Sequence, residues 1–356
     1  MNQRVEGLIQ ALEPGLEGIL ISSPENRRYL SGFTGSAGVL IITPETARLA
    51  TDFRYYEQVR QQAPEFELVE VSQRVEPVLA RELAALGLER IGFESAAITH
   101  ETYERWRNAL SSVELVPTTG LVEGLRAVKD ESELAAIAEA VRIADEAIEQ
   151  MMDTIRPGMT ERQVAWDLEV YMRTHGAEAL AFTTIVAAGP HAAMSHAVVT
   201  ERPIQRGEPV VIDMGARVEG YCSDITRSFC VGEADERYLQ VWNTVLEAQL
   251  AAEDQIRAGM TGIQADAIAR DIIYGAGYEG RFGHGLGHGV GLAIHEEPRA
   301  GMTATGVLPA QTVLTVEPGI YIPGWGGVRI EDMVVVGEEG CRILTGARKQ
   351  AVVPGQ

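Results

Sequence analysis

Short runs of aliphatic and β-branched residues alternate with more polar stretches across residues 18–117. Such runs, bounded by turn residues, are typical of strands, and the polar stretches between them have the length of helices. The pattern predicts helices from about Phe53 and near residues 77–86 and 99–110, and strands at residues 18–22, 37–43, 47–52, 66–71, 90–94 and 113–117. This alternation predicts an α/β domain of mixed strands and crossover helices.

A charged amphipathic segment over residues 129–155 predicts one long helix. The helix should end at Arg156-Pro157-Gly158, because proline and glycine interrupt helices. A chain of 356 residues is long for a single compact core. We therefore predict two domains, an α/β domain over residues 1–124 and a second domain over residues 125–356.

The second domain contains an internal repeat. Residues 156–178 recur as residues 257–279, at an offset of 101 residues, with Arg, Gly, Met, Thr, Gln, Gly and Glu in register. A long helical pattern precedes each copy and strands follow it. The duplication predicts a domain with a pseudo-twofold internal repeat and a site between its halves, since two copies are too few for a solenoid.

The net charge of −21, from 30 basic and 51 acidic residues, repels phosphate backbones and anionic lipids. We therefore expect no nucleic-acid partner and no membrane association. No segment reaches the roughly 20 apolar residues of a membrane-spanning helix, and the N-terminal pattern is not that of a signal peptide. The three cysteines lack paired spacing, which favours a reducing compartment and a cytoplasmic location.

Two acidic pairs lie in segments that predict hairpins. A turn between Val218 and Glu219 would place Asp213 directly opposite Asp224, and a hairpin centred on Gly324 would place Glu317 opposite Glu331. Like charges opposite each other destabilise a sheet, and a bound cation removes that objection. One such pair alone is better explained as solvent-facing acids, but two pairs on the two sides of a duplication favour a metal site.

Histidines gather around the same segments. Five of the seven histidines lie in residues 191–196 or 281–298, the second a glycine-rich stretch with His284, His288 and His295. Four carboxylates and one imidazole form an oxygen-rich set that favours a hard divalent ion such as Mn²⁺. Paired ions of this kind catalyse hydrolysis, and the sequence has neither a Gly-x-Ser-x-Gly elbow nor a Walker phosphate loop.

These residues resemble the pita-bread metallopeptidases, the family of methionine aminopeptidase, aminopeptidase P and prolidase. The likeness runs from about residue 125 to the end of the sequence, and its five-ligand pattern matches at Asp213, Asp224, His288, Glu317 and Glu331. It implies a creatinase-like α+β catalytic domain with two divalent metal ions, for which we expect Mn²⁺, with Co²⁺ or Zn²⁺ as alternatives. Asp224 and Glu331 would bridge the ions, Asp213 would bind one, and His288 and Glu317 the other.

The same resemblance implies roles around the metals. His196 and His295 match the histidines that hold the scissile carbonyl, and Glu317 matches the proton shuttle. His284 matches a histidine on the substrate side, and Arg329 an arginine of the proline-specific branch. For Arg329, a role as partner of the local acids is an equal alternative. His175 and His191 match no role and are interpreted as structural.

The N-terminal Gly-Phe-Thr-Gly-Ser-Ala-Gly and Thr-Asp-Phe-Arg-Tyr-Tyr motifs resemble the amino domain of aminopeptidase P more than that of prolidase. We therefore predict an Xaa-Pro aminopeptidase acting on proline-containing peptides, with an Xaa-Pro dipeptidase as the alternative. The resemblance also implies a homodimer. A catalytically inactive binding module is a remote alternative, since no ligand is missing. An oxidoreductase is disfavoured because the Gly-x-Gly-x-x-Gly signature is absent.

Overall fold

The computed structural model describes residues 2–355. The chain divides into two compact units, Met1–Arg126 and Ala127–Gln356. The sequence-predicted boundary between residues 124 and 125 falls inside helix α6 (Leu121–Ala127). Within residues 2–355, no helix is both long enough and apolar enough to cross a membrane.

The first unit is built on a six-stranded mixed sheet with the order β4-β3-β2-β1-β5-β6. The β1–β5, β5–β6 and β3–β4 pairs are parallel, and the β1–β2 and β2–β3 pairs are antiparallel. All of the predicted strands of this unit are confirmed: β1 (Ile19–Ile21), β2 (Val39–Ile42), β3 (Ala47–Asp52), β4 (Glu67–Val71), β5 (Arg90–Glu94) and β6 (Glu114–Thr118).

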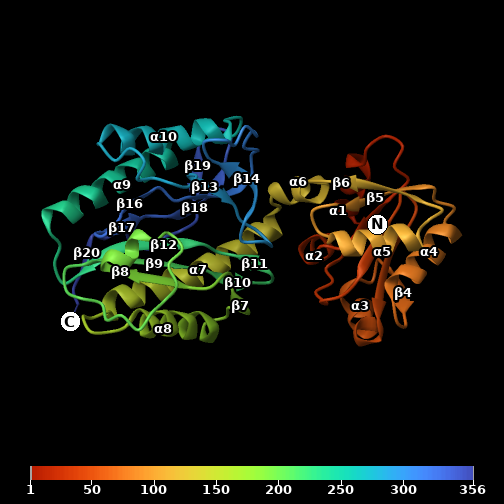
Figure 1. Ribbon diagram of the computed structural model, residues 1–356, viewed down its shortest axis with the longest axis horizontal. Coiled ribbons are helices and arrows are strands. Elements are labelled where there is room, and N and C mark those ends of the chain that lie inside the picture. Colours follow the sequence, from red (N-terminus) through yellow and green to blue (C-terminus); the bar gives the residue numbers. More distant parts are fainter. Residues whose placement is uncertain (1, 356) are drawn as a thin grey trace. The chain divides into compact units, whose positions relative to one another are not determined.

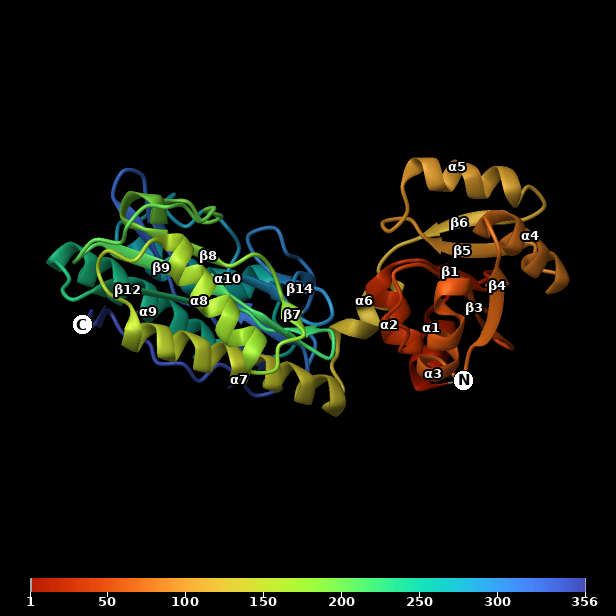
Figure 2. The same cartoon turned by 90° about the horizontal axis from the view of Figure 1, so that it is seen from below.

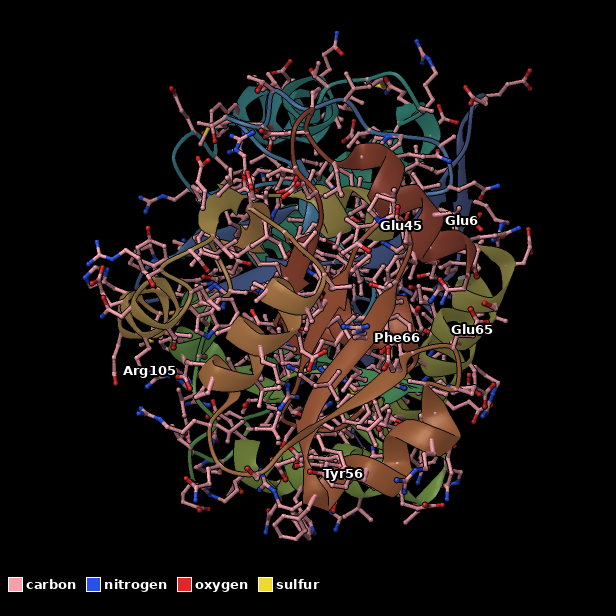
Figure 3. All side chains as sticks on the ribbon, turned by 90° about the vertical axis from the view of Figure 1, so that its right-hand side faces the viewer. Glu6, Glu45, Tyr56, Glu65, Phe66 and Arg105 are labelled. Carbon is pink, nitrogen blue, oxygen red and sulfur yellow. The ribbon has the colours of Figure 1, made fainter. Side chains whose placement is uncertain are left out.

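The helices of this unit confirm the three predicted ones and add three. The full set is α1 (Gln3–Ala11), α2 (Pro24–Ser31), η1 (Phe53–Tyr55), α3 (Tyr56–Gln62), α4 (Val75–Ala85), α5 (His100–Ala109) and α6. The sequence did not predict α1, α2 or α6, although α1 and α2 begin at side-chain caps from Asn2 and Ser23. Around this unit the side chains of Glu6 and Arg105 are exposed, whereas Phe66 is buried (Figure 3).

The second unit contains several sheets, in which the strands pair antiparallel except for the parallel β12–β20 pair. A four-stranded sheet has the order β20-β12-β9-β8 and a five-stranded sheet the order β14-β13-β15-β18-β19; β11-β10-β7 and β16-β17 form smaller ones. The strands are β7 (Ala179–Leu180), β8 (Ile185–Ala188), β9 (Pro209–Met214), β10 (Ala216–Val218), β11 (Tyr221–Cys222), β12 (Ile225–Val231), β13 (Gly287–Gly289), β14 (Glu296–Ala300), β15 (Val313–Val316), β16 (Gly319–Ile322), β17 (Gly326–Arg329), β18 (Asp332–Val336), β19 (Cys341–Ile343) and β20 (Val352–Val353).

Two helix pairs enclose these sheets and confirm the internal repeat. Each pair consists of a long helix followed by a repeat copy, α7 (Glu131–Thr154) with α8 (Glu161–Thr174), and α9 (Glu236–Gln255) with α10 (Gly262–Gly275). The strands lie between the two pairs (Figures 1 and 2). Both α8 and α10 start with a capping box, in which a threonine and a glutamine satisfy backbone N–H groups. A short 3-10 helix, η2 (Gly189–Ala193), follows β8.

The first acidic hairpin differs from its predicted register. Its turn lies at Glu219 and Gly220, whose φ angles of 48° and 82° suit a two-residue hairpin turn. This shift places Thr226, not Asp224, opposite Asp213. The predicted direct opposition of Asp213 and Asp224 is therefore wrong. Asp224 is the diagonal neighbour of Asp213 on the same face, because side chains alternate with a period of two.

The second acidic hairpin has the predicted register. Ile322 pairs with Gly326 and Val316 pairs with Asp332, so the hairpin is centred on Gly324. The ladder is interrupted at Glu317 and Glu331 themselves. The N–H of Glu317 donates to the Leu286 carbonyl at 2.9 Å, and the N–H of Glu331 donates to the Thr226 carbonyl at 3.1 Å. Both acids are thus tied to the segments that carry the other candidate ligands.

Candidate metal centre and substrate pocket

Three buried carboxylates meet where β9, β12 and β18 approach one another. Asp213, Asp224 and Glu331 each offer an oxygen, and these oxygens lie within 4.8 Å of one another. Thr226 donates its hydroxyl to Glu331 Oε2 at 2.6 Å. Asp213 Oδ1 is buried without a hydrogen-bond partner among residues 2–355. A buried acceptor of this kind indicates that a ligand completes the site.

His288 and Glu317 complete the cluster. His288 Nε2 lies 3.3 Å from Glu317 Oε1 and 3.7 Å from Asp224 Oδ2. The other ring nitrogen, Nδ1, is 3.1 Å from the Gly289 carbonyl and donates to it, so Nε2 is the nitrogen that faces the acids. Gly287 and Gly289 are needed here, since a Cβ at either would lie 1.9 or 2.2 Å from a backbone carbonyl oxygen.

The electrostatics fit a divalent cation. Burial raises the pKa of Asp224 and Glu331 well above the usual range of carboxyl groups, and the neighbouring acids raise both further. Burial also opposes ionisation of Glu317, but the hydrogen bond and charge of His288 outweigh it and lower the pKa of Glu317 to about 2. A cation among these oxygens removes their repulsion. An oxygen-rich set with one imidazole suits a hard divalent ion.

Arg329 links this cluster to Tyr321 and His284. Its guanidinium donates to Asp213 Oδ2, to the Thr226 hydroxyl at 3.0 Å, to the Ser195 carbonyl at 3.3 Å and to the Tyr321 hydroxyl at 2.9 Å. Tyr321 OH in turn lies 2.9 Å from His284 Nε2. Because His284 Nδ1 faces the Gly285 carbonyl at 2.8 Å, Nε2 accepts from the tyrosine.

Sequence reasoning missed Tyr321 and Thr226. Both lie at even spacing from predicted ligands, Tyr321 after Glu317 and Thr226 after Asp224, which places each on the face of its ligand. This two-residue periodicity is the sequence signal that could have identified both residues. Gly327, opposite Tyr321, leaves room for the ring, because a Cβ there would lie 2.9 Å from it.

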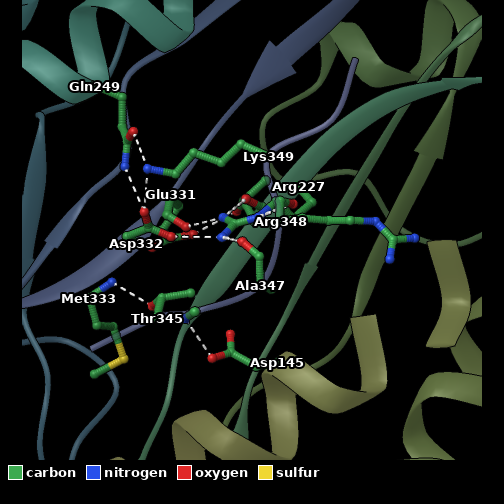
Figure 4. A network of polar contacts seen from close by, with 12 residues as sticks. Asp145, Arg227, Gln249, Glu331, Asp332, Met333, Thr345, Ala347, Arg348 and Lys349 are labelled. Carbon is green, nitrogen blue, oxygen red and sulfur yellow. Dashed lines mark hydrogen bonds and ion pairs between the residues drawn. The ribbon is translucent and has the colours of Figure 1, made fainter. Parts of the chain in front are cut away.

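A second polar network lies at the Glu331–Asp332 peptide. Arg227 donates through Nη1 to the Glu331 carbonyl at 2.6 Å and through Nη2 to Asp332 Oδ1 at 2.8 Å. Lys349 contacts the other Asp332 oxygen at 2.6 Å. Figure 4 shows these contacts converging from β12 and from residues 345–349. They fix the backbone that carries Glu331.

A cavity of about 690 Å³ opens onto the metal cluster. Its apolar wall includes Phe182, Ile185, Ile294 and Met302. Every residue predicted for the site lines it, namely Asp213, Asp224, His288, Glu317, Glu331, His196, His295, His284 and Arg329. The rings of His288 and His295 make an edge contact with centroids 4.4 Å apart.

The two histidines interpreted as structural do not line this cavity. The His175 ring stacks on Tyr171, with centroids 3.8 Å apart. His191 Nδ1 lies 2.8 Å from Glu161 Oε1. Burial lowers the pKa of His295, and the nearby His288 and Arg299 lower it further, which favours a neutral ring in His295.

Comparisons with known proteins agree with this arrangement. Residues 135–338 match the metallopeptidase family M24, and residues 4–128 match the creatinase/prolidase N-terminal domain. An uncharacterized peptidase of Bacillus subtilis is 41% identical over 95% of this chain and 96% of its own. The Xaa-Pro dipeptidase of Pyrococcus horikoshii is 36% identical over 99% of each chain.

Two solved structures are similar over nearly the whole chain. The Xaa-Pro dipeptidase from Bacillus anthracis has a TM-score of 0.96 and 43% identity, covering 98% of this chain and 99% of its own. The X-Pro aminopeptidase from Thermotoga maritima has a TM-score of 0.91 and 38% identity, covering 99% and 100%. These matches confirm the resemblance and the fold class predicted from the sequence. The chain therefore belongs to metallopeptidase family M24 and is a metallopeptidase with a creatinase/prolidase N-terminal domain.

Proposed function

We propose that this metallopeptidase hydrolyses the Xaa-Pro bond of proline-containing peptides. The supporting observation is that Arg329 and His284 line one cavity with the carboxylate cluster, and that the Tyr321 hydroxyl joins these two side chains. Relatives that match along nearly their whole length are named for action on Xaa-Pro substrates. The experiment is release of proline from Ala-Pro by the metal-loaded protein, with Ala-Ala as the control dipeptide.

We assign the metal-binding role to Asp213, Asp224, His288, Glu317 and Glu331, with two Mn²⁺ ions as the expected occupants. Bound divalent ions supply an activated water and a Lewis acid for the scissile carbonyl. Glu317, as a carboxylate beside the activated water, accepts its proton and passes it to the proline nitrogen. His196 and His295 donate N–H groups to the carbonyl oxygen as negative charge develops on it.

Arg329 acts chiefly through its neighbours in this proposal. Four of the five N–H groups of a guanidinium are used in its contacts with Asp213, Thr226, Ser195 and Tyr321. Those contacts fix Tyr321 and hence the ring of His284, which lines the cavity. This supports the alternative reading of Arg329 as a partner of the local acids.

Dipeptides are proposed as the principal substrates, because the relatives named Xaa-Pro dipeptidase match at 36% and 43% identity over at least 98% of this chain. The aminopeptidase reading is the second candidate, favoured by the T. maritima structure at 38% identity. Rates on Ala-Pro, Ala-Pro-Ala and a longer Ala-Pro peptide separate the two. Faster cleavage of the longer peptides would reverse this order.

The metal identity, a homodimer and a cytoplasmic location remain predictions from the sequence. Mn²⁺, Co²⁺ and Zn²⁺ can be compared by loading the metal-free protein with each ion and measuring Ala-Pro hydrolysis. Sedimentation of the full chain measures the oligomeric state. Binding of Ala-Pro without turnover under every metal would instead support the binding-module alternative.

A further inference from the structure

The loop between β8 and Thr200 carries His196 to the cavity, yet it has little regular structure of its own. Beyond η2, residues 194–199 form no helix or strand. Met194 and Val198 are 60% and 76% exposed, and the apolar contacts of this part of the loop are those of the small Ala197 and the partly buried Val199. A loop of this kind needs polar contacts elsewhere to present one side chain in a fixed position.

Those contacts come from a single carboxylate. Glu161, the first residue of α8, is fully buried. Its Oε1 accepts from the Ala188 N–H at 2.9 Å and from His191 Nδ1 at 2.8 Å. Its Oε2 accepts from the N–H and the hydroxyl of Thr200, at 3.0 and 2.6 Å. Both ends of the loop, and His191 within it, are therefore tied to one side chain.

Burial of this carboxylate goes beyond what a helix start requires. An exposed glutamate at the first turn would interact equally well with the helix dipole, and burying a charge is costly unless all its acceptor positions are used. Here four donors satisfy the two oxygens, and hydrogen bonds to a charged acceptor are the stronger kind. At the equivalent position of the second repeat copy stands Gly262, so the carboxylate is particular to the half that carries this loop.

The middle of the loop is held by β17. The Ser195 carbonyl accepts from Arg329 Nη1 at 3.3 Å. The Ala192 carbonyl packs on Gly327, where an added Cβ would lie 2.2 Å from the oxygen. With the ends fixed by Glu161 and the middle by β17, the position of His196 between them is determined.

We propose that Glu161 is a positioning residue that, through His191 and Thr200, holds the 189–199 loop so that His196 faces the scissile carbonyl. The loop-holding part stands on the contacts above, and the role of His196 rests on the proposed function. His191, which matched no role in the sequence, thereby joins the support of the site.

Hydrogen exchange on the full chain tests the loop directly, without any substrate. Glu161→Gln leaves an amide NH₂ facing two donors, and the amides of residues 188–200 should exchange at least about tenfold faster, whereas those of residues 313–322 should not change. The matched control is Glu201→Gln, an exposed glutamate that pairs with Arg162 and should leave exchange unchanged. Unchanged exchange in folded Glu161→Gln overturns the proposal.

If Glu161→Gln fails to fold, Thr200 provides the same test. Thr200→Val removes the hydroxyl that donates to Oε2 and accepts from the Arg202 N–H, and Thr200→Ser keeps both contacts. Faster exchange of the loop amides in Thr200→Val, restored in Thr200→Ser, supports the proposal. Equal exchange in both variants contradicts it.

Kinetic measurements then test whether Glu161 affects hydrolysis through His196. Glu161→Gln should lower kcat/KM for Ala-Pro about 10- to 100-fold, with Mn²⁺ affinity by calorimetry unchanged. Combined with His196→Ala, it should lower activity no further than His196→Ala alone, because both changes remove one function. Additive losses would contradict this link. An inactive wild-type protein would refute the proposed function, while the exchange experiment would still decide the role of Glu161.

Discussion

Helices α8 and α10 begin alike, with the threonine and glutamine of a capping box, but they hold the site in different ways. In the first half, Glu161 holds the His196 loop by four hydrogen bonds. In the second half, a Cβ on Gly262 would lie 2.1 Å from the Arg299 carbonyl oxygen, which leaves no space for a carboxylate. In this half, Asp266 and Arg270 farther along α10 fix the histidine-bearing segment instead.

The pair on α10 is a buried ion clamp. Arg270 donates to Asp266 at 2.6 and 2.8 Å, and to the carbonyls of Phe282 and His284 at 2.7 Å each. The Leu286 N–H donates to Asp266 at 2.9 Å. The repeat thus preserves the start and packing of a helix, whereas the polar contacts that fix each histidine-bearing segment are specific to one half.

The largest expected effect comes from removing Asp224, a carboxylate of the first half that lies 3.7 Å from His288 of the second half. Asp224→Asn should lower Ala-Pro hydrolysis more than about 100-fold, beyond typical losses at outer-shell positions, and lower metal content with it. The metal-free variant should be more stable than the metal-free wild type, because one of the mutually repelling acids is gone. Metal analysis and thermal unfolding measure both effects. Full activity with full metal content would remove Asp224 from the site.

Arg270→Ala breaks the clamp of the second half. It leaves the buried Asp266 without its cation, so the free energy of unfolding should fall by about 3–5 kcal/mol. Arg142→Ala is the control, since Arg142 pairs with Glu139 and Glu146 on an exposed face and should cost less than about 1 kcal/mol. Urea titration measures both. Equal losses would show that burial does not distinguish the two arginines.

Asp145 on α7 gives the first half a dependence on pH. Burial raises the pKa of Asp145 from 3.8 to about 6, against an opposing hydrogen bond from the Gly346 N–H. Because the folded state then holds the proton more tightly than the unfolded state, stability should fall as pH rises from about 4 to about 6. Asp145→Asn should remove this slope and stabilise the protein at pH 7 by about 2–3 kcal/mol at most. An unchanged slope in urea titrations from pH 4 to pH 7 would contradict the assignment.

Tyr321→Phe should have the smallest of these effects. It removes the hydroxyl between Arg329 and His284 and keeps the ring, so kcat/KM for Ala-Pro should fall about tenfold with unchanged metal content. Tyr278→Phe, at a tyrosine whose hydroxyl makes neither of these two contacts, is the matched control. A loss of metal in Tyr321→Phe would place the hydroxyl among the contacts of the cluster instead.

Sequence patterns predicted the strands of the first unit and the repeat of the second, since each is a local or periodic signal. The gathering of the predicted ligands also followed from paired strands. The register of the first hairpin did not follow from the sequence. It depends on which residues take positive φ, and here Glu219 does so beside Gly220. Helices α1 and α2 were missed, although Asn2 and Ser23 cap them.

Contacts between distant segments were not predictable in the same way. Arg227 meets Asp332 across 105 residues, and Glu161 meets Thr200 across 39, and neither separation has a period that a single sequence reveals. His191 was interpreted as structural, and its contact with Glu161 shows why it lies in the cluster of histidines. Buried polar pairs are thus the part of the site that the sequence alone does not predict.

The network around Arg227 also sets an order of events during synthesis. Asp213 and Asp224 leave the ribosome well before Glu331, and Arg227 stays without its acceptors until Asp332 and the carbonyl of Ala347 have been made. The N-terminal unit can fold while translation continues, but the acidic cluster cannot. A chain truncated before residue 345 should therefore bind a divalent cation poorly, even though it contains every proposed ligand.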